Sequence, residues 1–451
     1  MQLDLTLKQV KEKKCLIEIF GLGYVGFPLA VRLSSSGYKI RGIDTNPTRI
    51  KRLQSNSLME SEVSLKQEFL HSRDENRFEL TDNSIQTNTA KVGLICVPTP
   101  IPKNKIHSDV NVISAVKNFL QTCKAGDIII LESSIEIGTT EKIEKLIESK
   151  GFKVGEDFGL CFCPERIDPQ NKKWNLENIP RVIYSSDDIT YQVAQQIYQN
   201  VNNSHLIRVF SPKIAEIVKS FENAFRLVNI SLVNELALLC DKLNINVKDV
   251  IKAASTKPFG FMPFYPGAGA GGHCIPKDPL FLLESAKKFG LNFNTIETSL
   301  TINSFMPKYI ADSIEGIIEK TGLKKMILVI GLTYKPDIED LRDSPGFRIV
   351  KELLNKSFEV TTFDPYFKTD LREKYIIENN LEGFDFKELN DLNDDKKIKN
   401  FDSICIVQHH TKIKSRINEI YAKSLVPLIY DCGNKLIRNP QSKTNLKLLG
   451  S

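Results

Sequence analysis

Short apolar runs alternate with polar or helical stretches over the first part of the chain. The runs cover residues 15–20, 39–43, 91–97, 127–131 and 159–163. Runs of this length are typical of strands buried on both faces, as parallel strands are. Residues 27–35 read as a helix, and the polar, weakly patterned residues 52–89 predict a helical excursion over the sheet. The pattern therefore predicts an α/β domain with a parallel sheet.

The rhythm changes at Pro212, which stands at the favoured first position of a helix. Apolar residues then recur at helical spacing without a breaker before Asn244: Ile214, Ile217, Val218, Phe221, Phe225, Val228, Leu232, Leu236 and Leu239. They predict one helix about 45 Å long at 1.5 Å per residue. Such a helix is a natural spine between two α/β halves and a natural surface for a homodimer or a larger homo-oligomer.

A second α/β half follows this helix. Helices are expected at 280–289, 304–320 and 345–354, and strands at 325–330, 358–363, 403–407 and 428–431. The chain thus divides into an N-terminal domain (1–210), a central helical domain (211–320) and a C-terminal domain (321–451).

Composition narrows the class of protein. With 451 residues, 41% hydrophobic and 26% charged, the chain reads as soluble and globular. A net charge of +6 suits anionic small molecules but is too diffuse to indicate nucleic acid. Nine scattered cysteines indicate neither a disulfide framework nor a metal site, and they favour a reducing cytoplasm. The N-terminus lacks a secretory pattern and no window approaches 18 apolar residues, so membrane insertion is not expected.

The first apolar run ends in the sequence Gly21-Leu22-Gly23-Tyr24-Val25-Gly26. Gly21 permits the turn, Gly23 lets backbone N–H groups approach a pyrophosphate, and Gly26 lets helix and strand pack closely. Asp44 ends the second strand and would hydrogen-bond the ribose hydroxyls, which favours NAD over NADP. The alternative is an α/β turn with fortuitous glycines.

Polar residues follow several predicted strands at the edge where open α/β sheets bind ligands. Thr99 and Ser134 are candidates for cofactor or substrate contacts, although turn capping explains either one equally well. Glu165 and Arg166 also follow a strand, where the alternative is a surface ion pair. The C-terminal half lacks G-x-G-x-x-G, so Lys335 and Arg342 are expected to contact an anion other than a second dinucleotide.

Residues 266–279 form a glycine-rich stretch that delivers Cys274, with Lys277 and Asp278 close behind it. Glycines let the backbone close around a ligand, and a nearby ammonium stabilises a thiolate nucleophile. The alternative is a structural turn with a buried thiol.

Lys219 and Asn223 are four residues apart on the long helix and therefore share a face. Together they supply the donors that an oxyanion needs, whereas a surface lysine is the commoner finding on a long helix.

These motifs, with Tyr334-Lys335-Pro336 through Asp340 to Pro345, occur in an order that resembles the UDP-sugar 6-dehydrogenases over essentially the whole chain. The resemblance implies two doubly wound Rossmann-like domains joined by the long helix, with NAD in the first domain and the UDP group largely in the second. It also implies two successive oxidations at the sugar C6, with Cys274 holding the carbon first as a thiohemiacetal and then as a thioester.

The resemblance also assigns roles residue by residue. The implied catalytic residues are Cys274, Lys219, Asn223, Asp278, Glu165 and Ser134. The implied cofactor contacts are Gly21, Gly23, Tyr24, Val25, Gly26, Asp44, Arg49, Thr99, Ser134, Lys277 and Arg342. The implied substrate contacts are Glu165, Arg166, Lys219, Asn223, Tyr265, Gly267, Gly271 and Lys335.

Two motifs, Gly-Gly-His-Cys-Ile and Pro-Glu-Arg-Ile, resemble the branch that oxidises UDP-N-acetylhexosamines. Residues 256–261 and 264–267 are most like the UDP-N-acetylglucosamine enzymes, so that sugar is the expected substrate, in the synthesis of a surface polysaccharide. UDP-N-acetylmannosamine is the alternative, and UDP-glucose is a more distant one. A cysteine hydrolase using Cys274 with His273 is disfavoured, because adjacent residues rarely point at one another.

Overall fold

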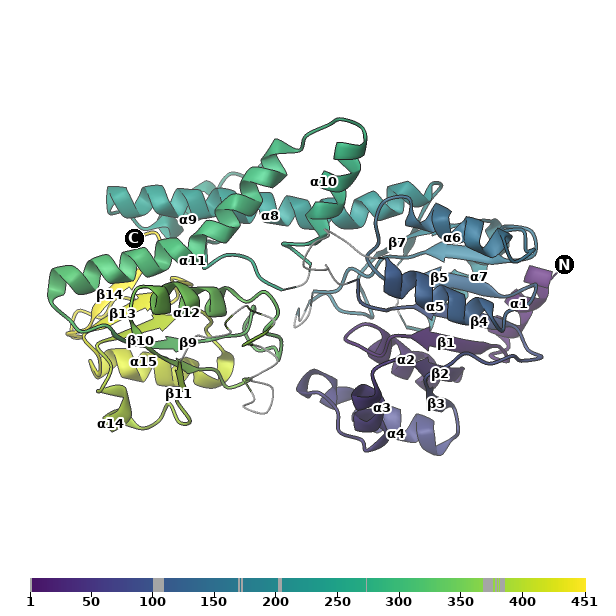
Figure 1. Cartoon of the computed structure of the whole chain (residues 1–451), viewed down its shortest axis with the longest axis horizontal. Helices are drawn as coiled ribbons and strands as arrows, with labels where there is room; N and C mark the ends of the chain where they lie inside the picture. The colour runs from purple at the N-terminus through teal and green to yellow at the C-terminus, as the bar shows by residue number, and fades with distance from the viewer. Residues whose placement is uncertain are drawn as a thin grey trace. The chain divides into compact units, whose positions relative to one another are not determined.

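The computed structural model describes residues 2–99, 109–168, 171, 173–201, 205–272, 274–367, 376–377, 379, 381 and 386–451. The chain forms two compact units, which are described separately (Figure 1). Unit 1 comprises residues 1–221 and 280–290, and unit 2 comprises residues 222–279 and 291–451. His273 lies outside the described residues.

Among the described residues of unit 1, eight strands form one sheet in the order β3-β2-β1-β4-β5-β6-β7-β8. The strands are β1 (Leu16–Phe20), β2 (Lys39–Ile43), β3 (Phe78–Thr81), β4 (Lys91–Ile95), β5 (Ile128–Leu131), β6 (Gly159–Phe162), β7 (Arg181–Ser185) and β8 (Leu206–Val209). Every pairing is parallel except that of β6 with β7, which is antiparallel. The first six strands follow the order 3-2-1-4-5-6 of dinucleotide-binding folds.

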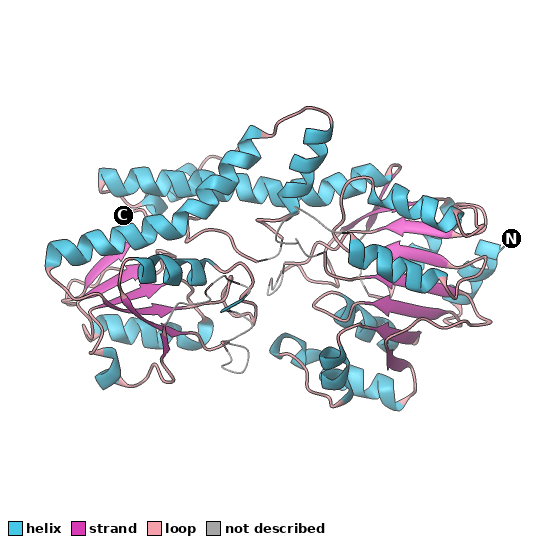
Figure 2. Ribbon diagram, in the orientation of Figure 1, coloured by secondary structure: helices cyan, strands magenta, loops and turns pink. Residues whose placement is uncertain are grey.

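Helices cover both faces of this sheet (Figure 2). They are α1 (Gln2–Lys11), α2 (Gly26–Ser35), α3 (Pro47–Gln54), α4 (Lys66–Asp74), α5 (Val110–Leu120), α6 (Thr139–Glu148) and α7 (Asp188–Gln199), with the 3₁₀ turn η1 (Glu60–Leu65). Alternate strand residues enter different cores, because successive side chains of a strand point to opposite faces. Ile128 and Ile130 pack in the cluster that includes residues of α1, α2 and α7, whereas Ile129 and Leu131 pack with residues of α5 and α6.

Unit 2 contains a second sheet of the same order, β11-β10-β9-β12-β13-β14 among the described residues, and every pairing is parallel. Its strands are β9 (Met326–Ile330), β10 (Glu359–Phe363), β11 (Lys387–Glu388), β12 (Ser403–Ile406), β13 (Leu428–Asp431) and β14 (Asn445–Leu448). Its helices are α9 (Val247–Ala254), α11 (Asn294–Thr321), α12 (Pro345–Asn355), α14 (Asp395–Ile398) and α15 (Lys414–Ala422), with the 3₁₀ turn η3 (Thr411–Ile413). Both helices α8 (Pro212–Leu243) and α10 (Asp278–Lys288) contribute residues to both units.

The predicted α/β architecture and the long helix are confirmed, since α8 begins at Pro212 and ends just before Asn244. Two expectations need correction. The stretch 52–89 is helical only up to Asp74, because Phe78–Thr81 pairs with β2 as an edge strand. The helix expected at 304–320 begins earlier, at Asn294, and accommodates Pro307 in its interior.

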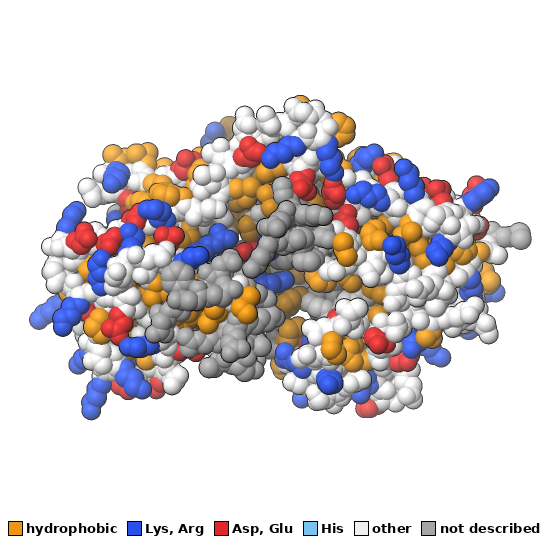
Figure 3. Space-filling view, in the orientation of Figure 1, with side chains coloured by type: hydrophobic (Ala, Val, Ile, Leu, Met, Phe, Trp, Pro, Cys, Tyr) orange, Lys and Arg blue, Asp and Glu red, His pale blue; other side chains and the backbone are white. Residues whose placement is uncertain are grey.

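Side chains of both charge signs are interspersed on the face shown in Figure 3. Within the described part of the chain, none of the helices is long and apolar enough to cross a membrane. Recognition of a charged ligand on that face therefore depends on local groups rather than on a broad field of one sign.

Candidate active site

The turn after β1 has the geometry that its glycines predict. Gly21 has φ +88°, and an added Cβ there would lie 2.8 Å from the carbonyl oxygen of Cys96. A Cβ on Gly26 would lie 1.9 Å from the Gly21 oxygen, so α2 packs on the turn only with glycine at that position. A Cβ on Gly23 would meet nothing within 4 Å, which leaves the backbone open to a ligand. Tyr24 is exposed and Val25 precedes the first residue of α2.

Asp44, at the end of β2, faces this turn and is half-buried. Its Oδ2 accepts a hydrogen bond from Leu22 N at 2.8 Å and its Oδ1 accepts one from Asn46 N at 2.8 Å. Arg49 supports the same turn from within, because its Nε donates to the Leu22 oxygen and its two terminal nitrogens bind the Glu62 carboxylate at 2.5 and 3.1 Å. The predicted contact of Arg49 with the cofactor stays a prediction.

Further predicted residues of unit 1 follow strands β4, β5 and β6. Thr99 is buried and Ser134 is half-buried. The backbone carbonyl oxygen of Glu165 accepts a hydrogen bond from Lys219 Nζ at 2.6 Å. The Arg166 side chain donates to the backbone oxygen of Pro180 at 2.8 Å. The structure therefore joins the Glu165 segment to α8 through Lys219.

A buried pair of charges lies behind these strand ends. Glu132 bonds Arg181 Nη2 at 2.6 Å and Tyr198 OH at 2.5 Å, and all three side chains are at most 2% exposed. Burial raises the pKa of the Glu132 carboxyl, although Arg181 opposes that effect. Glu132 O also accepts from Glu165 N at 3.4 Å, so the pair anchors the segment that carries Glu165.

Another carboxylate, Glu216, anchors the first part of α8. Its oxygens accept hydrogen bonds from Gly138 N at 2.6 Å, and from Thr140 N and Oγ1 at 2.9 and 2.7 Å, at the start of α6. Sequence reasoning did not identify Glu216. It lies one helical turn before Lys219 and fixes this part of the helix to unit 1.

Unit 2 carries Cys274. Of the chain's nine cysteines, all of them described, Cys274 alone is exposed. The Cys274 carbonyl accepts hydrogen bonds from Lys277 N at 3.1 Å and Asp278 N at 2.8 Å, so the cysteine stands at the turn that starts α10. An exposed thiol in a constrained turn is available to a substrate.

Asn223 and Asp278 form a buried polar pair in unit 2. Asn223 Nδ2 donates to Asp278 Oδ2 at 2.7 Å, and the two side chains are 7% and 1% exposed. The hydrogen bond links α8 to the Cys274 turn, because Asp278 also donates its backbone N–H to Cys274. The structure thus brings together three of the predicted catalytic residues.

Two asparagines that sequence reasoning missed hold the glycine-rich loop before Cys274. Asn303 Oδ1 accepts from Ala270 N at 2.6 Å, while its Nδ2 donates to the Ala270 oxygen at 2.9 Å. Asn234 Oδ1 accepts from Gly267 N at 2.9 Å. Both asparagines are at most 2% exposed, and a buried amide on an apolar helix face is the sequence signal that could have identified them.

The remaining predicted residues of unit 2 lie in the glycine-rich loop and in the segment after β9. Gly271 has no room for a side chain, because an added Cβ would lie 2.6 Å from the Asp343 oxygen. Lys277 pairs with Asp343 at 2.8 Å, and Arg342 pairs with Asp340 at 2.6 Å. Tyr265 is exposed and Lys335 is half-buried.

Unit 2 repeats the turn of unit 1. Gly331 has φ +90°, and Leu332 N donates to Asp364 Oδ2 at 2.6 Å, as Leu22 N does to Asp44. An added Cβ on Gly346 would lie 2.8 Å from the Gly331 oxygen, which is the relation between Gly26 and Gly21.

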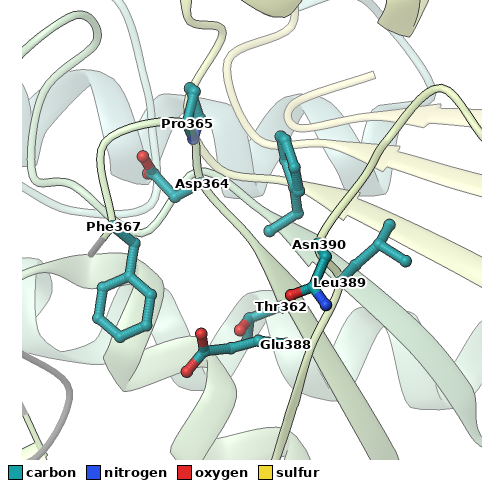
Figure 4. A pocket seen from close by; sticks show the side chains of 8 residues that line it. Thr362, Asp364, Pro365, Phe367, Glu388, Leu389 and Asn390 are labelled. Carbon is teal, nitrogen blue, oxygen red and sulfur yellow. The ribbon is translucent and has the colours of Figure 1, made fainter. Parts of the chain in front are cut away.

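A cavity of about 290 Å³ lies beside Asp364, at the carboxyl ends of β10 and β11. Figure 4 shows Asp364, Phe367 and Glu388 among its lining residues. Its lining residues include none of the predicted site residues. Among the described residues, no group of three or more His, Cys, Asp or Glu side chains is arranged to hold a metal ion.

A sheet of this order, with a glycine-rich turn after its first strand and a carboxylate after its second, defines a dinucleotide-binding fold. Domain models of the UDP-glucose/GDP-mannose dehydrogenase family match the chain in three parts: the NAD binding domain at residues 15–202, the central domain at 213–304 and the UDP binding domain at 328–438. The chain belongs to this family, and it is an NAD-dependent UDP-sugar dehydrogenase. The resemblance inferred from the ordered motifs and the expected NAD cofactor are confirmed.

Relatives extend the similarity over the full length. The UDP-N-acetyl-D-mannosamine dehydrogenase of Methanococcus aeolicus is 34% identical, over 100% of this chain and 98% of that protein. The UDP-N-acetyl-D-glucosamine 6-dehydrogenase of Salmonella typhi is 32% identical, over 80% and 85%. The structure of a UDP-D-ManNAc dehydrogenase from Pyrococcus horikoshii superposes with a TM-score of 0.83 at 31% identity, and covers 96% of this chain and 99% of that one.

Proposed function

We propose that this enzyme oxidises C6 of a UDP-N-acetylhexosamine from alcohol to carboxylate, with Cys274 as the covalent nucleophile. The observation that supports the proposal most directly is the exposed Cys274 thiol, held in a glycine-rich turn beside the buried Asn223–Asp278 pair. The overall change consumes one water and two NAD and yields one carboxylate, two NADH and three protons.

The residues of unit 1 fit the cofactor. Gly23 leaves backbone open for a pyrophosphate, and Asp44 offers a carboxylate to the ribose hydroxyls. NAD, when bound there, accepts the hydride that each oxidation removes from C6. Glu165 and Ser134 assist proton transfer and positioning in this proposal.

Cys274 of unit 2 carries the covalent chemistry in this proposal. The Cys274 sulfur adds to the aldehyde carbon to form a thiohemiacetal, and loss of the second hydride leaves a thioester. Water then adds to the thioester carbon and the thiol leaves, which restores Cys274 and releases the acid. Asn223 and Lys219 stabilise the oxyanion, a contribution of about 3 kcal/mol per donor in other enzymes. Asp278 orients the attacking water.

The remaining predicted contacts divide between the two ligands. Lys277 and Arg342 lie toward the cofactor in this proposal, and Lys335 binds the diphosphate of the substrate. Arg166, Tyr265, Gly267 and Gly271 complete the substrate contacts.

The sugar has two candidate epimers. Three relatives that cover 94–100% of this chain, including the one from Methanococcus aeolicus, are named for N-acetylmannosamine, which makes that sugar the first candidate. Residues 256–261 and 264–267 resemble the N-acetylglucosamine enzymes, and the Salmonella typhi relative carries that name, so UDP-N-acetylglucosamine is the second.

The test is NADH formation with UDP-N-acetylmannosamine, UDP-N-acetylglucosamine and UDP-glucose offered separately, counted per sugar consumed. Two NADH from one N-acetyl sugar and little from UDP-glucose would support both the reaction and the branch. Formation of NADH from UDP-glucose alone would refute the N-acetylhexosamine assignment.

A Cys274→Ser variant tests the covalent step. We expect it to bind NAD as the wild type does but to lose at least 99% of acid formation, because a serine hydroxyl is a much weaker nucleophile than a thiolate. Acid formation at the native rate would show that the mechanism does not pass through Cys274. Cys240→Ser, a buried cysteine on α8, is the matched control.

We also propose that two copies associate through α8. Apolar side chains on one stripe of this helix are 41–63% exposed: Ile214, Ile217, Phe221, Phe225, Leu232, Leu239 and Leu243. A continuous apolar stripe of this length is typical of a protein interface. Sedimentation velocity should show a dimer or larger for the wild type and a monomer for Leu232→Glu, whereas Arg226→Glu, which lies off the stripe, should leave the assembly intact.

The cytoplasm is the proposed location, because none of the nine cysteines, all of them described, forms a disulfide, which fits a reducing compartment. The uronate product would serve the synthesis of a surface polysaccharide.

A further inference from the structure

The segment that carries Lys335 is fixed at both ends by a single histidine. His410 follows β12 and is completely buried. Its Nδ1 accepts a hydrogen bond from Asp337 N at 3.0 Å, and its Nε2 lies 3.1 Å from Asp364 Oδ2. Since Nδ1 accepts, the hydrogen of the neutral ring is on Nε2, which donates to Asp364.

Asp364 transmits this contact to the start of the segment. Its Oδ2 also accepts from Leu332 N at 2.6 Å and Thr333 N at 3.0 Å. Thr333 Oγ1 then donates to the carbonyl of Lys335 at 2.9 Å. His410 therefore holds residues 332–333 through Asp364 and residue 337 directly, and Lys335 lies between the two attachments.

The same segment supports the loop that leads to Cys274. Gly272 has φ +80°, and an added Cβ would lie 2.7 Å from the ring of Tyr334. A Cβ on Gly271 would lie 3.0 Å from the Tyr334 Cβ. The Tyr334 carbonyl is itself held by Gln408 Nε2 at 3.1 Å. The backbone of the glycine-rich loop thus rests on Tyr334, two residues before the nucleophile.

In the described structure the corresponding carboxylate of unit 1, Asp44, accepts fewer hydrogen bonds than Asp364 does. Asp44 is half-buried and accepts from Leu22 N and Asn46 N. Asp364 is 8% exposed and accepts from Leu332 N, Thr333 N, Tyr366 N and the histidine. Asp364, which is the equivalent in unit 2 of Asp44 in unit 1, therefore serves to hold the backbone.

We propose that His410 is a positioning residue that sets both the Lys335 segment and the Cys274 loop for the reaction. The inference rests on the proposed function for its kinetic consequence. The series of contacts that leads from His410 through Asp364 and Tyr334 to Gly272 does not depend on that function. Loss of the Nε2–Asp364 contact shifts Lys335 and Tyr334 together, so it weakens the UDP-sugar complex and changes the reactivity of Cys274.

The neighbouring residue offers a matched control. His409 is 8% exposed, and its Nε2 lies 2.7 Å from Asp431 Oδ1, so it is also a buried histidine paired with an aspartate. Asp431, however, accepts from the backbone of Gly433, Lys435 and Leu436. That turn carries none of the proposed site residues. Substitution of His409 therefore reports the general cost of losing a buried His–Asp pair.

The experiment compares His410→Asn, His410→Gln and His409→Asn in the full-length enzyme. An asparagine oxygen can replace Nδ1 and keep the Asp337 contact, whereas a glutamine amide can replace Nε2 and keep the Asp364 contact. We expect His410→Asn to raise the KM for the UDP-sugar at least ten-fold with the KM for NAD within two-fold. His410→Gln should recover most of that loss, and His409→Asn should leave both KM values within two-fold.

The second readout is the rate at which iodoacetamide alkylates Cys274, located by peptide mass mapping. This measurement needs no turnover, so it still tests whether His410 positions the Cys274 loop if the enzyme forms no NADH from any UDP-sugar. We expect His410→Asn to change the alkylation rate at least three-fold and His409→Asn to leave it unchanged. If His410→Asn fails to fold, Thr333→Val, which removes the hydroxyl bond to Lys335, should raise the UDP-sugar KM about three-fold.

Two results would overturn the proposal. One is an equal effect of His409→Asn and His410→Asn on the UDP-sugar KM and on Cys274 alkylation, which would leave His410 a purely structural role. The other is a His410→Gln variant no better than His410→Asn, which would exclude the contact with Asp364 as the one that matters.

Discussion

The contact between Gly272 and Tyr334 leads to a quantitative prediction for Gly272→Ala. Alanine at φ +80° costs about 1–2 kcal/mol, because its Cβ crowds the following carbonyl in the left-handed region. The same Cβ would lie 2.7 Å from the Tyr334 ring, and displacing a packed side chain costs about 1–3 kcal/mol more. We expect the free energy of unfolding to fall by about 2–5 kcal/mol, measured by urea denaturation followed by circular dichroism. The turnover number should also fall, since Cys274 is two residues away.

Two other glycines of unit 2 separate these contributions. Gly322, the cap of α11, has φ +71° with nothing within 4 Å of an added Cβ, so Gly322→Ala should show the backbone cost alone. Gly267 lies in the same loop, outside the left-handed region and in open space, so Gly267→Ala should change stability by less than about 1 kcal/mol. If Gly272→Ala and Gly322→Ala lose the same stability, the close approach to Tyr334 does not contribute and the reasoning is wrong.

Three further predictions concern unit 1. Asp44→Ala should weaken NADH binding at least ten-fold in a fluorescence titration while the UDP-sugar KM stays unchanged, because a charge-assisted hydrogen bond is worth about 1.5–3 kcal/mol; an unchanged NADH affinity would remove Asp44 from the cofactor site. Glu216→Gln should lower the free energy of unfolding by about 1–3 kcal/mol, since an amide cannot accept from Gly138 and Thr140 with both of its atoms; a loss below about 0.5 kcal/mol in urea denaturation would contradict the anchoring of α8. Burial raises the pKa of Asp127 from 3.8 to about 6, so the folded state favours the protonated carboxyl and this group's ionisation destabilises the protein as the pH rises from about 4 to about 6. The stability of wild type relative to Asp127→Asn should therefore fall by about 2–3 kcal/mol across that interval in urea denaturation, and a flat difference would contradict the burial argument.

Local sequence patterns were sufficient for much of the fold. Pro212 and the apolar spacing gave both ends of α8, because a helix of this length depends on contacts that recur every three or four residues. The glycine-rich turn could also be predicted, because few residues other than glycine tolerate the positive φ at Gly21 or the close packing at Gly26.

The missed strands and side chains depend on partners that are distant in sequence. Arg181 begins β7 and is 1% exposed, which is intelligible only once Glu132, 49 residues earlier, neutralises it. The edge strand Phe78–Thr81 is too short to show an apolar period. Sequence alone likewise gives no reason to connect Asn303 with Ala270, or His410 with Asp364.

The turn shared by the two units also sets the terms for redesign. A protein engineer who wished to install a second dinucleotide site after β9 would find the turn glycine, the helix glycine and the acidic residue already in place at Gly331, Gly346 and Asp364. Two features stand in the way. Thr333 stands where unit 1 has Gly23, and its side chain fills space that is open there. His410 hydrogen-bonds the Asp364 carboxylate, which a ribose would need as its partner. Restoring such a site would loosen the segment of Tyr334, which supports the loop before Cys274. A new ligand site in unit 2 would therefore come with a loss of turnover.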